Sequence, residues 1–545
     1  MIFRSSYPEI ELPPTSLTPF VLARARERGD KPALIDSASG RTITYRQLDE
    51  GVRRVAAGLS ARGFGKGDVF AIYSPNIPEY AVAFHAVSLV GGTLTTLNPV
   101  YTADEAAHQL EDAGARYLLT VPALLDKARA AAAHAGVEEV FVFGECDGAT
   151  PFAALYADVV ADVVADVVAD AGAGDGAGDE LNWPRVEIDP AEDVVVLPYS
   201  SGTTGLPKGV MLTHHNLIAN TLQVGACELV DESDTLVCVL PLFHIYGMVV
   251  IMNVGLYEGA QIVVMPRFDL ETFLKILQDY GVTMAHVVPP IMLALARHPS
   301  VDNYDLSKLR TLFSGAAPLS EELARACGER LGCEVRQGYG MTETSPAIHL
   351  TPPRAARPNY ASIGQCVPNT ECKIVDVETG EAVGHGREGE ICMRGPQMMK
   401  GYLNRPEATA ATIDADGWLH TGDIGYCDED GYFFIVDRLK ELIKYKGMQV
   451  APAELEALLL THPSVADAAV VPVADAEAGE LPKAFVVLKA GAEGVAAEEL
   501  MAFVAGRVAP YKKIRRLEFI EQIPKSASGK ILRRVLVERE RERAK

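Results

Sequence analysis

Short apolar runs alternate with amphipathic stretches along most of the chain. The apolar runs are bounded by turn-forming residues and predict buried strands at residues 69–73, 117–121, 140–143, 235–240, 261–265 and 284–288. Helical patterns lie between several of these runs, for example at residues 81–89. This alternation predicts an α/β fold with layered sheets that are largely parallel.

The pattern changes twice towards the C-terminus. Glycine-containing turns surround short strand patterns at residues 390–394 and 432–436, which predicts a β-rich subdomain. From about residue 440, helical patterns at 453–461 and 497–508 are mixed with strand patterns at 467–473 and 484–488. We therefore predict a large N-terminal domain of several subdomains, residues 1–438, followed by a small α+β C-terminal domain, residues 439–545.

Residues 157–170 repeat the sequence Ala-Asp-Val-Val three times and lead into a segment rich in glycine and alanine. A four-residue period drifts around a helix and places acidic side chains next to one another. The segment is typical of a variable surface insertion or linker. A short amphipathic helix is the alternative, and the sequence leaves the role of the repeat open.

The charge balance limits the possible partners. The 545 residues include 73 acidic and 50 basic side chains, which gives a formal net charge of −23. Proteins that bind bulk nucleic acid or anionic membranes usually carry the opposite balance. We therefore expect small-molecule substrates and no nucleic acid partner.

Cysteine use and the N-terminus indicate the compartment. The nine cysteines form no Cys-x-x-Cys pair, which argues against a disulfide framework and a structural zinc site. The first residues do not resemble a signal peptide, and no apolar run reaches the length of a membrane span. These features predict a cytoplasmic protein without a membrane span, and they leave open whether it is a monomer or a homodimer.

The strongest chemical signal is the sequence Tyr-Ser-Ser-Gly-Thr-Thr-Gly-Leu-Pro-Lys-Gly at residues 199–209. It follows an apolar strand at 194–197 and precedes a helical pattern that starts at His214. Glycines allow backbone N–H groups to approach a ligand, and the hydroxyls and Lys208 add polar and positive groups. The spacing does not match a Walker A loop. The segment therefore predicts a polyphosphate-binding loop of another kind.

Four further motifs follow in order. They read Tyr-Gly-Met-Thr-Glu at 339–343, Thr-Gly-Asp at 421–423, Asp-Arg-Leu-Lys at 437–440 and Pro-Lys-Ser-Ala-Ser-Gly-Lys at 524–530. Asp423 and Glu343 offer carboxylates, and a carboxylate oxygen is a hard ligand suited to Mg²⁺. Arg438 and Lys530 offer positive charges that could pair with phosphate. Taken singly, each would be an ordinary turn or surface residue.

Together, the five motifs resemble those of the adenylate-forming superfamily, which includes acyl-CoA synthetases, luciferases and the adenylation domains of peptide synthetases. Within that superfamily, the loop at 200–209 and the sequence Gly-Glu-Ile-Cys-Met-Arg-Gly at 389–395 look most similar to 4-coumarate–CoA ligases. Met393 replaces the usual isoleucine of that second segment, and we expect no chemistry from Cys392. The resemblance spans nearly the whole chain.

The resemblance implies ATP, Mg²⁺ and coenzyme A as cofactor and co-substrates, and a two-step reaction. The acid first forms an acyl adenylate and is then transferred to the CoA thiol. The implied ATP/AMP-binding residues are Ser200, Ser201, Gly202, Thr203, Thr204, Gly205, Lys208, Gly338, Tyr339, Gly340, Met341, Thr342, Asp423 and Arg438. Glu343 and Thr204 are the implied Mg²⁺ ligands, and Lys530 and His244 the implied catalytic residues.

The resemblance also implies that the C-terminal domain is mobile and pivots at Lys440 between the two steps. This rotation would withdraw Lys530 and bring a different face of the domain to the substrate. The implied CoA-binding residues on that face are Lys444, Lys446, Gly447 and Gln449. Glycine at position 447 would let the pantetheine arm pass close to the backbone.

The acid pocket is implied by the sequence Pro-Leu-Phe-His-Ile-Tyr-Gly at 241–247, which would otherwise be hydrophobic core with one satisfied histidine. The implied lining residues are Tyr246, Ala294, Phe313, Gly315, Ala316, Pro346 and Ala347. Phe313 stands where some plant ligases have a lysine suited to the ring hydroxyl. A pocket that does not bind the hydroxyl discriminates weakly against its absence, so cinnamate should be accepted.

Three alternatives remain open. They are a medium-chain fatty acid–CoA ligase, a luciferase-like monooxygenase and a non-catalytic sensor of acyl adenylates. Lys530 in a full-length loop argues against the sensor. An amino-acid-activating enzyme is disfavoured, because residues 241–248 contain no acidic side chain to pair with a substrate ammonium group.

Overall fold

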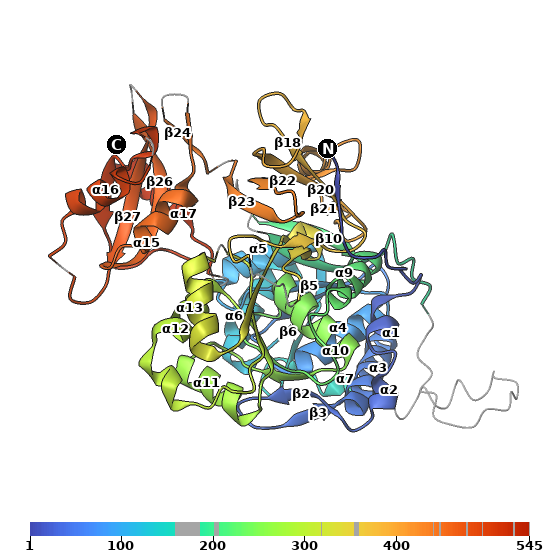
Figure 1. Ribbon diagram of the computed structural model, residues 1–545. Coiled ribbons are helices and arrows are strands. Elements are labelled where there is room, and N and C mark those ends of the chain that lie inside the picture. The colour runs from blue at the N-terminus through green and yellow to red at the C-terminus, as the bar shows by residue number, and fades with distance from the viewer. Residues whose placement is uncertain are drawn as a thin grey trace, which may run out of the picture.

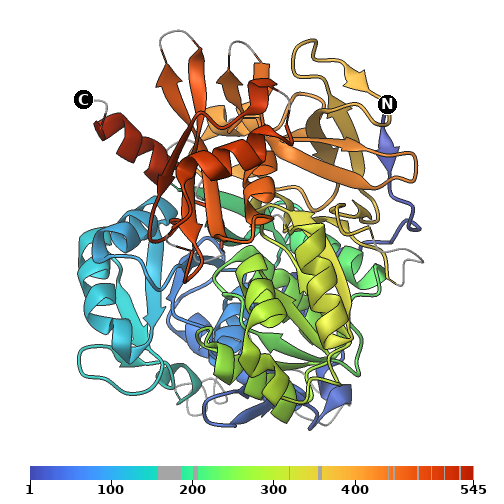
Figure 2. The ribbon, with the colours of Figure 1, turned by 60° about the vertical axis from the view of Figure 1, so that its left-hand side comes forward.

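The computed structural model describes residues 1–157, 186–200, 207–317, 319–353, 359–439, 441–445, 448–475, 478–492, 494–508, 510–526 and 529–543. Three sheets and their helices form a large N-terminal part, and a fourth sheet forms a smaller C-terminal part (Figure 1). The C-terminal part rests across the junction between the large sheets (Figure 2). Beyond its first residue, the Ala-Asp-Val-Val repeat lies outside the described residues.

The first sheet contains eight strands in the order β21-β10-β9-β5-β4-β6-β7-β8. Its core is parallel, and β10 runs antiparallel to β9. In chain order the strands are β4 (Val69–Tyr73), β5 (Thr93–Leu97), β6 (Ala115–Thr120), β7 (Glu139–Val142), β8 (Thr150–Pro151), β9 (Val194–Ser200), β10 (Lys208–Thr213) and β21 (Gly401–Tyr402).

The second sheet contains nine strands in the order β17-β16-β15-β14-β13-β11-β12-β2-β3, and its centre is also parallel. The strands are β2 (Pro32–Asp36), β3 (Thr42–Thr44), β11 (Thr235–Cys238), β12 (Gln261–Val264), β13 (Met284–Val287), β14 (Thr311–Ser314), β15 (Glu334–Gly340), β16 (Ala347–Leu350) and β17 (Gln365–Cys366).

Helices pack between and around these two sheets (Figure 1). They are α1 (Leu17–Val21), α2 (Ala25–Arg28), α3 (Tyr45–Ala61), α4 (Glu79–Leu89), α5 (Ala103–Ala113), α6 (Leu125–Ala135), α7 (Ala154–Ala157), α9 (His214–Ala226), a π-helical segment (Tyr246–Asn253), α10 (Val254–Glu258), α11 (Leu270–Asp279), α12 (Pro289–Arg297), α13 (Glu321–Leu331) and α14 (Pro406–Thr412).

The local sequence explains where several of these helices begin and which face they bury. The carboxylate of Asp269 accepts a hydrogen bond from the Thr272 backbone N–H at the start of α11, and an apolar stripe of α11 is buried. Helix α4 is apolar on all sides and packs against α1, α3 and β5. A helix that is hydrophobic all round is buried in this way in large domains.

The third sheet is the predicted β-rich subdomain, with the order β1-β18-β20-β22-β23 and with β19 paired to β18. All its neighbouring strands are antiparallel. The strands are β1 (Phe3–Arg4), β18 (Glu371–Val375), β19 (Ala382–Val383), β20 (Gly389–Arg394), β22 (Leu419–Cys427) and β23 (Phe433–Arg438). The N-terminal strand β1 closes one edge.

The C-terminal part has its own sheet, β25-β24-β27-β26 with β28 beside β27, and its own hydrophobic core. Its strands are β24 (Ile443–Tyr445), β25 (Met448–Val450), β26 (Val465–Asp475), β27 (Gly479–Leu488) and β28 (Arg516–Phe519). Its helices are α15 (Pro452–Leu460), α16 (Ala497–Ala505) and α17 (Arg533–Arg543).

The predicted fold class is confirmed, and the predicted strands and helices occur within a few residues of their expected bounds. Strand β23 ends the third sheet and β24 begins the fourth, on either side of the predicted boundary at 438/439, which itself stays a prediction. Among the described residues, no helix combines the length and the apolar character that a membrane span requires.

Candidate active site

The phosphate-binding motif forms the end of a β-hairpin. Strand β9 ends at Ser200 and β10 begins at Lys208, with Ser200 and Lys208 as paired residues. The helical pattern predicted from His214 is confirmed, because α9 begins at that residue. Strand β10 occupies residues 208–213, directly before the helix. The predicted residues Ser201, Gly202, Thr203, Thr204 and Gly205 lie outside the described residues.

Glu343 connects three segments that are distant in the sequence. Its Oε1 accepts hydrogen bonds from the Ser200 hydroxyl at 2.9 Å and the Tyr402 hydroxyl at 2.8 Å. The Lys208 ammonium lies 4.4 Å from the centre of the Tyr402 ring. Tyr402 was missed in the sequence because it belongs to none of the motifs. Only the pairing of β21 with β10 brings it to the site.

Asp423 is held between two donors at the opposite corner of the site. The Tyr339 hydroxyl donates to its Oδ2, and Arg438 Nε donates to its Oδ1 at 2.9 Å. The pairing of β22 with β23 places residues 423 and 438 opposite each other. Asp423 is only 2% exposed, and this burial raises its pKa, whereas the charge of Arg438 lowers it. Tyr339 and Arg438, which belong to two different motifs, thus both contact the carboxylate of Asp423.

The lysine loop of the C-terminal part is docked against the N-terminal part. Gly529 has a left-handed φ of 79°, and a Cβ at this position would lie 3.3 Å from the Pro290 ring at the start of α12. Burial and the nearby charge of Arg438 lower the pKa of Lys530 to about 8, while Asp423 and Glu343 act in the opposite direction. Lys530 therefore lies within the same electrostatic environment as the ribose and metal candidates.

His244 faces this cluster from the N-terminal part. Burial, and secondarily the charge of Lys530, lower the pKa of His244 to about 4, so its imidazole is neutral at physiological pH. His244 lines a small cavity of about 30 Å³ together with Tyr199 and Thr342. A cavity of this size holds about one water molecule. The two predicted catalytic residues are thus brought together.

The remaining residues of the adenine segment form the strand end before Glu343. Strand β15 ends with Gly338, Tyr339 and Gly340. Met341 follows the strand, and Thr342 begins a 3-10 turn. A Cβ at Gly340 would lie 2.0 Å from the Pro346 carbonyl oxygen, so only glycine allows the chain to pass there. This packing fixes the adenine segment against the predicted acid pocket.

The predicted aromatic lining of the acid pocket packs around a histidine that the sequence did not reveal. The rings of Tyr246 and Phe313 lie 5.6 Å and 5.4 Å from the ring of His286. The Tyr246 hydroxyl is 3.2 Å from His286 Nδ1, while His286 Nε2 is buried and has no hydrogen-bond partner. A Cβ at Gly315 would lie 2.9 Å from the Tyr246 ring. The sequence did not indicate this histidine as a pocket residue, because it is a single polar residue within an apolar strand and belongs to no motif.

The other predicted pocket residues lie on three neighbouring segments. Ala294 is in α12, Ala316 follows β14, and Pro346 precedes β16. Ala347 is buried, and its backbone makes two hydrogen bonds with the side chain of Asn220. The Ala347 N–H donates to Asn220 Oδ1 at 3.0 Å, and Asn220 Nδ2 donates to the Ala347 carbonyl oxygen at 2.8 Å. The segments converge because β13, β14 and β15 are consecutive parallel strands.

The structure describes two of the four predicted CoA-binding residues. Lys444 is exposed on β24, opposite Gln449 on β25, whereas Lys446, Gly447 and the hinge candidate Lys440 lie outside the described residues. Strand β24 is at the end of the C-terminal part that points away from α12 and α13 (Figure 1). In this arrangement Lys530 is directed to the site, whereas strand β24, which carries Lys444, lies away from it.

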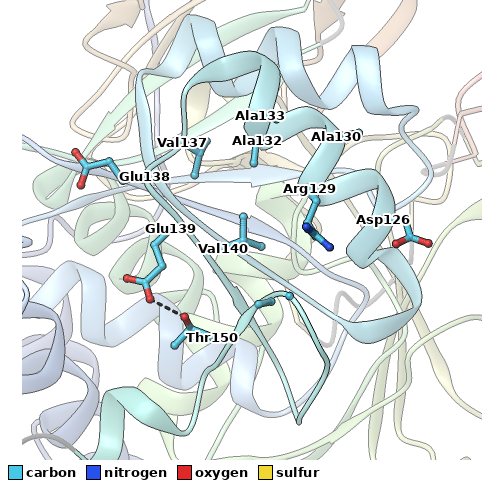
Figure 3. Close-up of a pocket in the computed structure, with 12 residues that line it drawn as sticks. Asp126, Arg129, Ala130, Ala132, Ala133, Val137, Glu138, Glu139, Val140 and Thr150 are labelled. Carbon is cyan, nitrogen blue, oxygen red and sulfur yellow. Dashed lines mark hydrogen bonds between the residues drawn. The ribbon is translucent and has the colours of Figure 1, made fainter.

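A larger surface hollow of about 780 Å³ lies elsewhere, around α6, β7 and β8 (Figure 3). Arg129, Asp126 and Glu139 are among the side chains that line it. It is open to solvent and contains none of the predicted site residues. Its size therefore does not mark it as the reaction centre.

Comparison with known proteins agrees with the motif geometry. The sequence profile of the AMP-binding enzyme family matches residues 21–403, and that of the AMP-binding enzyme C-terminal domain matches residues 454–530. The chain is 45% identical to 4-coumarate–CoA ligase 5 of Oryza sativa subsp. japonica over 544 residues, covering 98% of this chain and 96% of the rice protein.

Two solved structures share the fold over nearly the whole chain. ATP-bound MatB from Rhodopseudomonas palustris superposes with a TM-score of 0.85 at 29% identity, covering 97% of this chain and all of that one. The anthranilate CoA ligase AuaEII in complex with anthranoyl-AMP superposes with a TM-score of 0.85 at 26% identity, covering 98% and 99% of the two chains. The chain belongs to the family of AMP-binding, adenylate-forming enzymes.

Proposed function

We propose that this chain is an AMP-forming acid–CoA ligase that uses ATP to activate an acid of the 4-coumarate and cinnamate type. The observation that carries the proposal is the meeting of Lys530, His244, Asp423, Arg438 and Glu343 in one buried site. The 45% identity to a 4-coumarate–CoA ligase over nearly the full length supports the substrate class.

ATP would bind across the edge where the first and third sheets meet. Asp423 would accept both ribose hydroxyls, and the β9–β10 hairpin with Lys208 would hold the phosphates. Glu343 fits a Mg²⁺ ligand, because its buried carboxylate is oriented by the hydroxyls of Ser200 and Tyr402. When bound, Mg²⁺ would supply charge neutralisation at the phosphates.

In the first half-reaction, an oxygen of the substrate carboxylate attacks the α-phosphorus of ATP and pyrophosphate leaves. The ammonium of Lys530 stabilises the negative charge that develops on the α-phosphate oxygens. Neutral His244 lies beside Lys530 and would orient the acid without adding a second negative or positive charge. The main contributions are therefore positioning and charge neutralisation.

In the second half-reaction, the CoA thiol attacks the acyl carbonyl, the C–O bond to AMP breaks, and the thioester forms. Lys530 occupies the site in the observed arrangement, so this half requires the C-terminal part to turn about Lys440. The turn would bring Lys444, Lys446, Gly447 and Gln449 towards the adenylate. Arg438 and Asp423 stay with the N-terminal part.

Adenylation by the free enzyme is expected to weaken as the pH rises through about 8. The lowered pKa of Lys530 means that the side chain loses its positive charge in this range, and only the charged form stabilises the phosphate. The measurement is kcat/KM for ATP against pH in an assay of pyrophosphate release. In Lys530→Arg the remaining activity should lack this decline, because arginine stays protonated. An unchanged decline in that variant would assign it to another group.

Cinnamate and 4-coumarate are expected to give similar kcat/KM values, within about tenfold, because Phe313 offers no hydrogen bond to the ring hydroxyl. Phe313→Lys should shift the preference towards 4-coumarate. Both acids are assayed with the wild type and the variant, so each enzyme serves as its own control. A wild-type preference of about a thousandfold for 4-coumarate would contradict the prediction and would direct attention to the buried Tyr246–His286 pair.

A single screen tests the proposed function against its alternatives. The enzyme is incubated with ATP, Mg²⁺, CoA and a pool of aryl and medium-chain fatty acids, and the CoA thioesters are identified by mass spectrometry. Aryl thioesters as the main products support the proposal. Fatty acyl thioesters as the main products, or no thioester at all, would overturn it.

A further inference from the structure

A cluster of one histidine and two cysteines lies behind the adenine segment, outside the proposed reaction centre. Cys366 and Cys372 have their sulfur atoms 3.3 Å apart, and each sulfur is 3.5 Å from Nε2 of His349. All three side chains are buried, with exposures of 2% or less. Pairing of β16 with β17 sets His349 opposite Cys366, and Cys372 reaches the cluster from β18.

These distances are close to those of a metal site. In a tetrahedral zinc site, bonds of about 2.3 Å to sulfur and about 2.0 Å to nitrogen separate nitrogen from sulfur by about 3.5 Å and the two sulfurs by about 3.8 Å. The two nitrogen–sulfur distances agree with this geometry, and the sulfur–sulfur distance needs to open by a few tenths of an ångström. Rotation of the two thiol side chains suffices for that change.

The chemistry of the cluster also favours a bound cation. Two thiolates and a neutral imidazole would form a complex with Zn²⁺ that has no net charge. A neutral complex can be buried among apolar side chains at much lower cost than separate charges.

A second cluster of possible ligands, made of Glu390, Cys392 and His420, is weaker by comparison. His420 Nδ1 already lies 2.8 Å from the Glu390 carboxylate, and the other Glu390 oxygen accepts the Gly422 N–H. The polar atoms are therefore satisfied within the protein. In the first cluster, by contrast, Nε2 of His349 contacts the two thiols, and its Nδ1 is buried and has no hydrogen-bond partner.

We propose that His349, Cys366 and Cys372 bind a single Zn²⁺ ion with a structural role. The sequence argued against a structural zinc site because it contains no Cys-x-x-Cys pair. The fold instead assembles the ligands from three strands, with sixteen residues between His349 and Cys366 and five between the cysteines. Cys427 belongs to the same hydrophobic cluster and is a candidate for the remaining tetrahedral position.

The ion would join two sheets next to the nucleotide site. His349 and Cys366 belong to the nine-stranded sheet, whereas Cys372 belongs to the six-stranded sheet. The His349 ring also contacts Phe433, with ring centres 4.3 Å apart, and lies 5.8 Å from the Tyr339 ring. Zinc would therefore stabilise the β-rich subdomain against the adenine segment, and its removal should lower the Tm and raise the KM for ATP.

The test begins with the wild-type enzyme, purified without a metal-affinity tag under reducing conditions. It is loaded with Zn²⁺, passed through a desalting column with a weak chelator and analysed for metal. One retained zinc per chain is expected, together with a higher Tm than the chelator-stripped protein. Replacement by Co²⁺ should give the strong charge-transfer absorption of thiolate ligands. A wild type that retains no zinc, or that instead carries a Cys366–Cys372 disulfide in peptide mapping, overturns the proposal.

Variants then locate the site. His349→Ala, Cys366→Ala and Cys372→Ala should each lose the zinc, whereas Cys392→Ala, which removes a buried thiol from the other cluster, should retain it. Circular dichroism shows whether each variant is folded. If a variant does not fold, the cobalt spectrum and zinc content of the wild type still test whether the protein binds zinc. Retention of one zinc in folded His349→Ala, or its loss in folded Cys392→Ala, would contradict the assignment.

Discussion

Lys530→Ala is expected to lower the rate of acyl-adenylate formation by about 10²–10³-fold and to spare thioester formation from preformed adenylate. The substitution removes the ammonium group whose charge acts on both His244 and Asp423 in the observed arrangement. In the proposed mechanism the second half-reaction would not use this charge, because the lysine loop would leave before CoA enters. This one variant should therefore be slow in the first half-reaction and unchanged in the second.

The first half is measured as acid-dependent exchange of pyrophosphate into ATP, and the second as thioester formation from synthetic acyl adenylate and CoA. Lys525→Ala is the matched control. Lys525 lies in the same loop, but its ammonium is paired with Asp467 of the C-terminal part at 2.6 Å. Equal loss of both halves in Lys530→Ala would rule out the two-arrangement mechanism.

Asp423→Asn is the second substitution with a large expected effect. Two ribose hydroxyls would lose charge-assisted hydrogen bonds worth about 1.5–3 kcal/mol each. We therefore expect kcat/KM for ATP to fall by about 10²–10⁴-fold, mainly through KM. Loss of the buried partner of Arg438 should also lower the free energy of unfolding, by up to about 3–5 kcal/mol.

Steady-state kinetics with varied ATP and a thermal unfolding curve separate these two effects. Asp376→Asn provides the control, because Asp376 is a partly exposed turn aspartate of the same subdomain whose carboxylate accepts hydrogen bonds from the nearby residues Glu378 and Thr379. That variant should behave as the wild type in both measurements. A folded Asp423→Asn enzyme with an unchanged KM for ATP would remove the residue from the ribose site.

Local patterns predicted the elements well because their causes are local. The apolar run at residues 69–73 is strand β4 with the same bounds, and the helical pattern at 81–89 is α4 with two further residues. A short apolar run bounded by turn-forming residues favours a buried strand, and these features all lie within a few residues of one another. Strand β10 was not predicted, because the sequence Lys-Gly-Val-Met-Leu-Thr at 208–213 has no regular alternation of polar and apolar residues and overlaps the glycine-rich loop.

Residue types at fixed spacing also indicated the chemistry. Asp423 and Lys530 lie in short motifs whose side chains have few possible roles, and the structure places both in one electrostatic environment. By contrast, Tyr402 and His286 belong to no motif. Tyr402 reaches Glu343 through the pairing of β21 with β10, and His286 is held between Tyr246 and Phe313. Contacts between residues so far apart in the chain leave no local signal.

By itself, the sequence determined the α/β class, the order of the motifs and the chemical groups available for adenylation. Only the tertiary structure decided that Lys530 is docked towards His244 while Lys444 faces away, and that His349, Cys366 and Cys372 meet in one cluster. The physical reason is the range of the forces involved. Strand and turn preferences act over a few residues, whereas side-chain contacts depend on which strands pair and how the sheets pack.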